Sequence, residues 1–202
     1  MTRAKVWTYR LALFLLLAPG LAVAGDRPLD ITANPFETDF APGGRLSLDL
    51  CSSGVGLRGT DENKLRVSYN SKSAYDADRV KVRLKGSGNS VSLEIDGCPH
   101  NNFQITISLP KITHLYVRMW AGQLDISNIT GDKNLELHAG QLNVDVGKPE
   151  EYGQVDASVT TGELDAASFD VSKGGLFRSF HKSGPGKYKL HAHVGAGQID
   201  LN

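Results

Sequence analysis

The second half of the chain contains a short repeat, and this repeat limits the possible folds more than any other feature of the sequence. Each copy reads small residue, Gly, Gln or Glu, aliphatic residue, Asp or Asn, apolar residue. The four copies are AGQLDI (121–126), AGQLNV (139–144), TGELDA (161–166) and AGQIDL (196–201). The first three glycines are 18 and 22 residues apart, and the fourth lies 35 residues further on, close to two such periods. A period near 20 residues predicts a solenoid, in which each coil of chain covers the next.

The segment before each glycine alternates apolar and polar residues, which is typical of a β-strand with one buried face. In the first copy, Leu115, Val117 and Met119 are expected to point inward. After the glycine the next inward residue is Leu124, so the period of two is broken at this point. A glycine that breaks the alternation is typical of a corner or a bulge. The expected corner glycines are Gly122, Gly140, Gly162 and Gly197.

The first half of the chain also alternates, and it shows no convincing helical periodicity. The alternating segments are 45–51, 64–69, 79–86, 90–97 and 103–109. Together with the repeat they predict an all-β, single-domain parallel β-solenoid over residues 45–202, and residues 25–44 are expected to form an extended lead-in. A β-sandwich is the alternative, because its strands alternate in the same way.

Residues 1–24 have the features of a secretory signal peptide. Three basic residues precede the apolar run LALFLLL (11–17), and Ala22-Val23-Ala24 supplies small residues at the spacing that a signal peptidase recognises. The run is shorter than the roughly 20 residues that cross a bilayer. We therefore expect cleavage after Ala24, export to the periplasm, the cell surface or the medium, and no transmembrane segment in the mature chain.

Charge and cysteine content narrow the classes of partner and site. Without the leader the chain has 19 basic residues against 22 acidic ones, and no basic patch with interleaved aromatic residues, which argues against a nucleic-acid partner. An even number of cysteines in an exported chain predicts one disulfide, here between Cys51 and Cys98. Two thiols without a CxxC spacing do not make a zinc site.

The repeat and the first coils resemble a known family. Residues 103–202, with their repeated Gly-x-aliphatic-x-aliphatic segments, look like the bacterial "putative adhesin" family of exported domains, and GGRLSLDLCSSGVGLRGTDENKLRVSY (43–69) is similar to that family's opening coils. The resemblance implies a non-enzymatic interaction module that binds a protein or a cell-envelope polymer. It supplies no catalytic residues, because the shared motifs are structural.

Two sets of residues are candidates for partner binding. Tyr116, Arg118 and Trp120 have the outward parity of one expected strand, and exposed aromatic and Arg side chains are common in interfaces. The segment 172–188 interrupts the repeat and contains Phe177 and Phe180. This segment either binds a partner or caps one end of the solenoid, since an open end needs covering.

The remaining polar patterns predict no catalytic, metal or cofactor site. Asp125, Asn143, Asp165 and Asp200 recur at equivalent outward positions, and we interpret them as a solvated ladder rather than a cation site. His191 and His193 share one strand face but have no clear third ligand. The chain has no nucleophile motif. An enzyme or binding protein that acts on cell-envelope carbohydrate is the alternative function.

Overall fold

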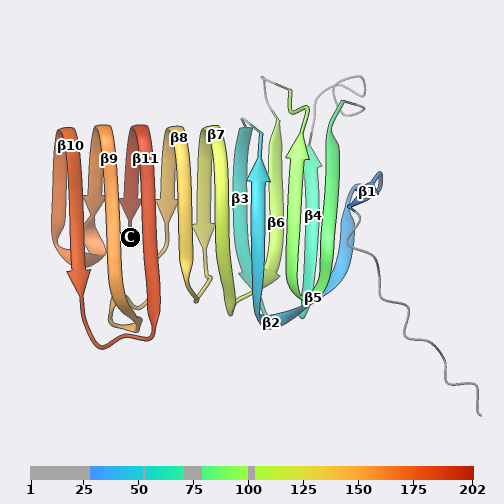
Figure 1. Ribbon diagram of the computed structural model, residues 1–202, viewed down its shortest axis with the longest axis horizontal. Helices are drawn as coiled ribbons and strands as arrows, with labels where there is room; N and C mark the ends of the chain where they lie inside the picture. The colour runs from blue at the N-terminus through green and yellow to red at the C-terminus, as the bar shows by residue number, and fades with distance from the viewer. Residues whose placement is uncertain (1–27, 52, 71–78, 100–102) are drawn as a thin grey trace, which may run out of the picture.

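The computed structural model describes residues 28–51, 53–70, 79–99 and 103–202, and in this part the chain is an all-β protein (Figure 1). Its eleven described strands form one hydrogen-bonded sheet. The expected signal peptide lies outside the described residues. The strands are β1 (Leu29–Ile31), β2 (Phe36–Leu50), β3 (Ser53–Thr60), β4 (Lys64–Asn70), β5 (Lys81–Asp96), β6 (Gln104–Pro110), β7 (Thr113–Ser127), β8 (Lys133–Val144), β9 (Tyr152–Ala166), β10 (Val171–Ser183) and β11 (Tyr188–Leu201). Two short 3₁₀ helices, η1 (Pro149–Glu151) and η2 (Ala167–Phe169), precede and follow β9.

The four copies of the repeat lie side by side in parallel strands and in register. β7 pairs with β8, β8 with β11, and β11 with β9. The C-terminal strand β11 is thus inserted between β8 and β9, and the C-terminus lies inside the row of strands rather than at its end (Figure 1). The spatial order of the copies therefore differs from their order in the sequence.

Each long repeat strand bends at its glycine. Figure 1 shows these strands turning back at one edge of the molecule, so that their two halves lie on opposite sides of the core. The four glycines have φ angles between 125° and 143°, where residues with a Cβ are strained. A Cβ on Gly140 would lie 1.9 Å from the carbonyl oxygen of Gly122, and one on Gly197 would lie 1.8 Å from that of Gly140. Glycine is therefore needed both for the bend and for the close approach of neighbouring strands.

The N-terminal half continues the same arrangement with separate strands. The second half of β2 pairs in parallel with the first half of β7, and β3 pairs in parallel with its second half. β5 and β6 add a further layer in the same way. Cys51 follows β2 and Cys98 follows β5, and the two form the expected disulfide with their Cα atoms 5.8 Å apart. The disulfide thus joins two neighbouring coils where each of them turns.

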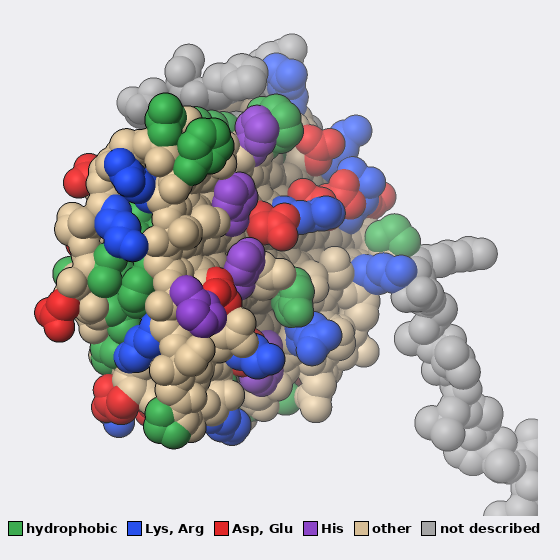
Figure 2. All heavy atoms as spheres, turned by 60° about the vertical axis from the view of Figure 1, so that its left-hand side comes forward, with side chains coloured by type: hydrophobic (Ala, Val, Ile, Leu, Met, Phe, Trp, Pro, Cys, Tyr) green, Lys and Arg blue, Asp and Glu red, His purple; other side chains and the backbone are tan. Residues whose placement is uncertain are grey.

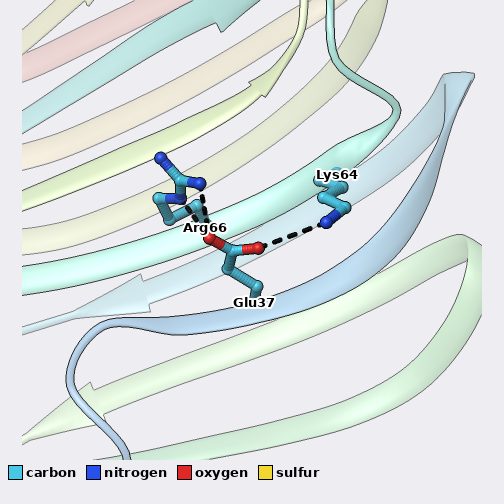
Figure 3. A network of polar contacts seen from close by, with 3 residues as sticks. All are labelled: Glu37, Lys64 and Arg66. Atoms are coloured by element: carbon cyan, nitrogen blue, oxygen red, sulfur yellow. Dashed lines mark hydrogen bonds and ion pairs between the residues drawn. The ribbon is translucent and has the colours of Figure 1, made fainter.

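The sheet is mixed, which corrects the expectation of a purely parallel β-solenoid. β4 is antiparallel to both β2 and β6, β1 is antiparallel to β5, and β10 is antiparallel to β9. Figure 3 shows the ion pairs that accompany the β2–β4 pairing: Arg66 and Lys64 both contact the carboxylate of Glu37. The hydrogen bond from Arg66 holds the pKa of Glu37 below its ordinary value. Alternation alone did not reveal these antiparallel pairs, because a strand with one buried face alternates in either direction.

The core consists of columns of aliphatic side chains that run along the sheet. One column contains Leu124, Leu142, Ile199 and Leu164, which occupy matching positions on β7, β8, β11 and β9 and are fully buried. Part of the segment 25–44 also belongs to this core, because Phe40 on β2 is buried. The columns leave every second side chain on the outer surface, and these outward positions form the rows described below.

Candidate functional site

The outer face of β7 carries three of the residues expected to bind a partner. Leu115, Val117 and Met119 are buried, so the residues between them point outward. Trp120 is 66% exposed and Tyr116 is 44% exposed. Arg118 lies between them and is also exposed. The structure thus places Tyr116, Arg118 and Trp120 together on one outer face, and no described part of a loop or of the lead-in segment covers them.

Parallel pairing in register extends each of these positions into a row across the sheet. Trp120 is followed by His138, Gly195 and Thr160, each of which lies two residues before its corner glycine. Arg118 is followed by Glu136, His193 and Ser158, each four residues before the glycine. Neighbouring rungs are about 4.8 Å apart. The equal distance from the repeat glycine is the sequence signal that would have identified these rows.

The row of Trp120 contains a stacked pair of rings. The indole of Trp120 and the imidazole of His138 lie 4.2 Å apart between centroids, at an angle of 15°. One face of the indole is covered by the histidine, while most of the ring remains open to solvent. The next position in the row is Gly195, which has no side chain to fill the space beside His138. The row therefore consists of two stacked aromatic rings, Trp120 and His138, followed by Gly195, a position without a side chain.

The row of Arg118 supplies the charged groups. Arg118 Nη2 is 3.2 Å from Asp49 Oδ2 on β2. On the other side of Arg118, the structure gives the carboxylate of Glu136 no ion pair or hydrogen bond with any described residue. Further along the row, His193 Nδ1 and Ser158 Oγ are 2.9 Å apart, which is hydrogen-bond distance. The row thus contains an ion pair, a carboxylate that no described residue pairs with, and an imidazole held by a hydrogen bond.

Two adjoining hollows lie on this face. The larger has a volume of about 350 Å³ and is bordered by Asp49, Arg118, Trp120, Glu136, His138 and His193, with Gly195 at one side. The second has a volume of about 330 Å³ and shares Asp49, Arg118 and Glu136 with the first, but it includes Tyr116. Arg45 lies over the ring of Tyr116, 5.4 Å from its centroid. The charged row therefore separates two hollows, each with an exposed aromatic residue.

Histidines are concentrated on this face, and Figure 2 shows them with acidic and basic side chains beside them. In a third row, His191 lies next to Asp156 on β9, and Asp156 Oδ1 is 2.5 Å from His181 Nδ1 on β10. The hydrogen bond from His181 holds the pKa of Asp156 below its ordinary value. Among the residues that the structure describes, no three His, Cys, Asp or Glu side chains are placed to hold a metal ion.

The two phenylalanines of segment 172–188 have different environments. The segment lies mostly within β10, which is the last strand at one end of the sheet and hydrogen-bonds along β9. Phe180 is half-buried and its ring lies 5.5 Å from that of Phe169. Phe177 is 79% exposed and lies opposite Thr160, in the row that begins with Trp120. The segment thus covers the end of the core with Phe180 and leaves Phe177 on the surface.

The opposite outer face carries the expected polar ladder. Asp125, Asn143, Asp200 and Asp165 occupy matching positions on β7, β8, β11 and β9. Amide groups bind two of the carboxylates, because Asn143 Nδ2 donates to Asp125 at 2.5 Å and Gln198 Nε2 donates to Asp200 at 3.3 Å. These hydrogen bonds agree with the interpretation of the ladder as a solvated, self-paired surface.

The sequence pattern does not reveal one buried polar pair. Lys133 lies at an inward position of β8, next to Leu115 on β7, and is only 2% exposed. Its ammonium group donates a hydrogen bond to the hydroxyl of Tyr152. Burial lowers the pKa of Lys133 to about 8 and raises the pKa of Tyr152. This pair is enclosed and does not contact the two hollows.

Comparisons with known proteins find a low similarity between this chain and two solved structures. No protein-family profile and no curated protein sequence matches it. A "putative cell adhesion protein" from Clostridium sporogenes is 16% identical with a TM-score of 0.48, over 87% of this chain and 99% of the other. A "putative adhesin" from Bacteroides fragilis is 14% identical with a TM-score of 0.37, over 88% of this chain and 98% of the other. Because both TM-scores are below 0.5, the fold described above stands on the strand pairing of this chain alone.

Within the part of the chain that the structure describes, no helix combines the length and the apolar character needed to cross a membrane.

Proposed function

We propose that this chain is an exported, non-enzymatic binding module of adhesin type. In this proposal the stack of parallel strands serves as a solenoid-like scaffold, and one of its lateral faces binds a protein or a cell-envelope polymer. We define the β7 face as the outer surface formed by Tyr116, Arg118 and Trp120 with the two adjoining hollows. Phe177 extends this surface towards the end of the sheet.

The exposure of Trp120 and Tyr116 on a rigid strand is the observation that carries the proposal. A partner that covers a large aromatic side chain that is 66% exposed gains hydrophobic stabilisation of the complex. Aromatic and Arg side chains together are the residues that contribute most to binding energy in interfaces. Because neighbouring strands hold all three residues in register, the β7 face is preorganised and loses little conformational entropy on binding.

Affinity capture from native cell envelope tests this proposal. The immobilised protein is compared with a Tyr116→Ala/Arg118→Ala/Trp120→Ala variant, which is expected to capture at least tenfold less material. The matched control is Gln123→Ala/Gln141→Ala/Gln198→Ala on the opposite face, which should capture as much as the original chain. If both variants capture equal amounts, and thermal unfolding curves show that both are folded, the β7 face is ruled out as the binding surface.

The second candidate is an enzyme acting on cell-envelope carbohydrate. Its support is the presence of two carboxylates, Asp49 and Glu136, in the same hollow, since glycoside hydrolysis uses a pair of acidic residues. The pairing of Asp49 with Arg118 favours a binding role for that carboxylate instead. Incubation with a broad panel of envelope glycans distinguishes the two candidates: turnover that is lost in Glu136→Gln would support the enzyme, and the absence of turnover would remove it.

A further inference from the structure

The larger hollow on the β7 face has a composition that fits one chemical class of ligand. Its rim contains the indole of Trp120, an acceptor-only carboxylate at Glu136, and the guanidinium of Arg118, which can only donate. His138 and His193 complete the rim with imidazole nitrogens that donate or accept according to their protonation. Apolar and polar groups thus converge on one small volume of about 350 Å³, which is typical of small-ligand sites.

Charge argues against an anionic ligand. The hollow contains the carboxylates of Asp49 and Glu136 and one guanidinium, so its formal charge is −1 with neutral histidines. Arg118 is already paired with Asp49, which leaves Glu136 as the carboxylate of this hollow that has no partner among the described residues. A phosphate, sulfate or carboxylate ligand would lie beside this unpaired negative charge and would be repelled. The ligand is therefore neutral or positively charged.

Hydrogen-bonding capacity favours a neutral polyhydroxylated ligand over an organic cation. Vicinal hydroxyl groups donate to a carboxylate and accept from a guanidinium, and the rim presents both side by side. A cation would interact with Glu136 and the indole but would offer no acceptor to the remaining N–H groups of Arg118. The weakly positive C–H groups on one face of a sugar ring also match the negative face of an aromatic ring. Trp120 covers one face of the His138 ring, so the other face of His138, toward Gly195, is available for this contact.

The gap at Gly195 gives the ligand space. His138 and Gly195 occupy neighbouring positions of one row, and Gly195 is present there because β11 is inserted between β8 and β9. A Cβ on Gly195 would lie 2.5 Å from the carbonyl oxygen of His138, so a larger residue would disturb this edge of the hollow. The hollow is therefore a product of the strand order and of one small residue.

We propose that the hollow between Trp120, Glu136, His138 and Gly195 binds a neutral sugar ring, which packs against the stacked Trp120–His138 pair on the side of Gly195 and hydrogen-bonds to Glu136 and Arg118. This inference rests on the proposed function, since it names the ligand class of the β7 face. It does not require the sugar to be cleaved.

Tryptophan fluorescence provides a direct test. The chain has two tryptophans, and Trp7 lies in the expected signal peptide, so a protein that begins at Gly25 has Trp120 as its only tryptophan. This protein is titrated with neutral oligosaccharides built from hexoses and from N-acetylhexosamines, and these two arms distinguish the two sources of sugar. At least one oligosaccharide is expected to give a saturable change in the Trp120 emission.

Substitutions on the β7 face test where the sugar binds. Trp120→Ala in the original chain, followed by calorimetry, is expected to weaken binding at least tenfold, and Glu136→Gln is expected to weaken it severalfold. The matched control Gln141→Ala on the opposite face should bind as the original chain does. The inference is overturned if no neutral oligosaccharide binds, if binding survives Trp120→Ala, or if poly-lysine saturates the site in place of sugars.

The outcomes also separate this inference from the proposed function. If envelope capture depends on the β7 face but no neutral sugar binds, the proposed function is supported and the inferred ligand class is wrong. If capture does not depend on the β7 face, the proposed function fails and the sugar inference fails with it.

Discussion

At the residue scale, Lys133 shows how the sheet tolerates a polar group at a core position. Its neighbours in the row are Leu115 on β7 and Leu190 on β11, which are both buried. The ammonium group reaches the hydroxyl of Tyr152 and lies 4.8 Å from the centre of its ring. The carboxylates of Asp145, Asp132 and Glu151 partly oppose the effect of burial on the pKa of Lys133. A buried polar group with a partner is tolerated, but its charged form is costly.

This pair predicts an unusual dependence of stability on pH. Burial lowers the pKa of Lys133 from 10.5 to about 8, so between these values the unfolded chain binds a proton that the folded chain does not. Stability therefore rises with pH in this window, by about 2 kcal/mol from pH 8 to pH 10. Above pH 10 the raised pKa of Tyr152 has the opposite effect, because the folded chain then retains the extra proton.

Urea denaturation at pH 7 to 10 measures this rise. The double variant Lys133→Met/Tyr152→Phe removes both titrating groups and is expected to show no increase, whereas the surface control Lys189→Met should keep the increase of the original chain. A flat profile in the original chain, or the same rise in the double variant, would contradict the assignment to Lys133.

At the element scale, the bend at the repeat glycine sets the geometry of every long repeat strand. The alternation of the sequence predicted the inward positions on both sides of the bend, and the buried residues Leu115 and Leu124 occupy them. The glycines also allow neighbouring backbones to approach closely, which the sequence pattern did not reveal. A repeat with one glycine per copy therefore specifies both the bend and the stacking distance.

Substitution of a corner glycine is expected to be costly. Gly140→Ala places a Cβ against the carbonyl oxygen of Gly122 and requires a strained φ of 129°, so we expect a loss of about 3 kcal/mol or more in the free energy of unfolding. The matched control is Gly56→Ala on β3, where a Cβ meets nothing within 4 Å. This control is expected to change stability by less than about 0.5 kcal/mol. If chemical denaturation shows similar losses of unfolding free energy in both variants, the corner position does not specifically require glycine.

Other features of the elements were not predictable from the sequence. β4 alternates in the same way as the parallel strands, so its antiparallel pairing with β2 and β6 left no signal in the pattern. In contrast, the position of Trp120 beside His138 could be predicted from the sequence, since both lie two residues before a repeat glycine. The adjacency of Gly195 to His138 could not be predicted, because it depends on which copies of the repeat lie on neighbouring strands.

At the scale of the whole molecule, the order of the strands determines the composition of the β7 face. The four copies are so alike that the sequence favoured stacking in chain order, with β9 next to β8. Instead, the last copy lies between them, and Leu142 and Leu164 are separated by Ile199 in the core column. Because all four copies present the same kind of inward side chain, core packing does not reveal the order to a reader of the sequence. With β9 beside β8, Thr160 rather than Gly195 would lie next to His138 and would reduce the hollow.

Disulfide trapping on the polar ladder is the most direct test of this strand order. Asn143, Asp200 and Asp165 lie on β8, β11 and β9, and the native cysteines are already paired with each other. Adjacent rungs are about 4.8 Å apart, which is within reach of a disulfide, whereas two rungs span about 9.6 Å, which is not. We predict that Asn143→Cys/Asp200→Cys forms a cross-link on mild oxidation and that Asn143→Cys/Asp165→Cys does not. A cross-link between positions 143 and 165, with none between 143 and 200, would place β9 beside β8 and contradict the fold and the site together.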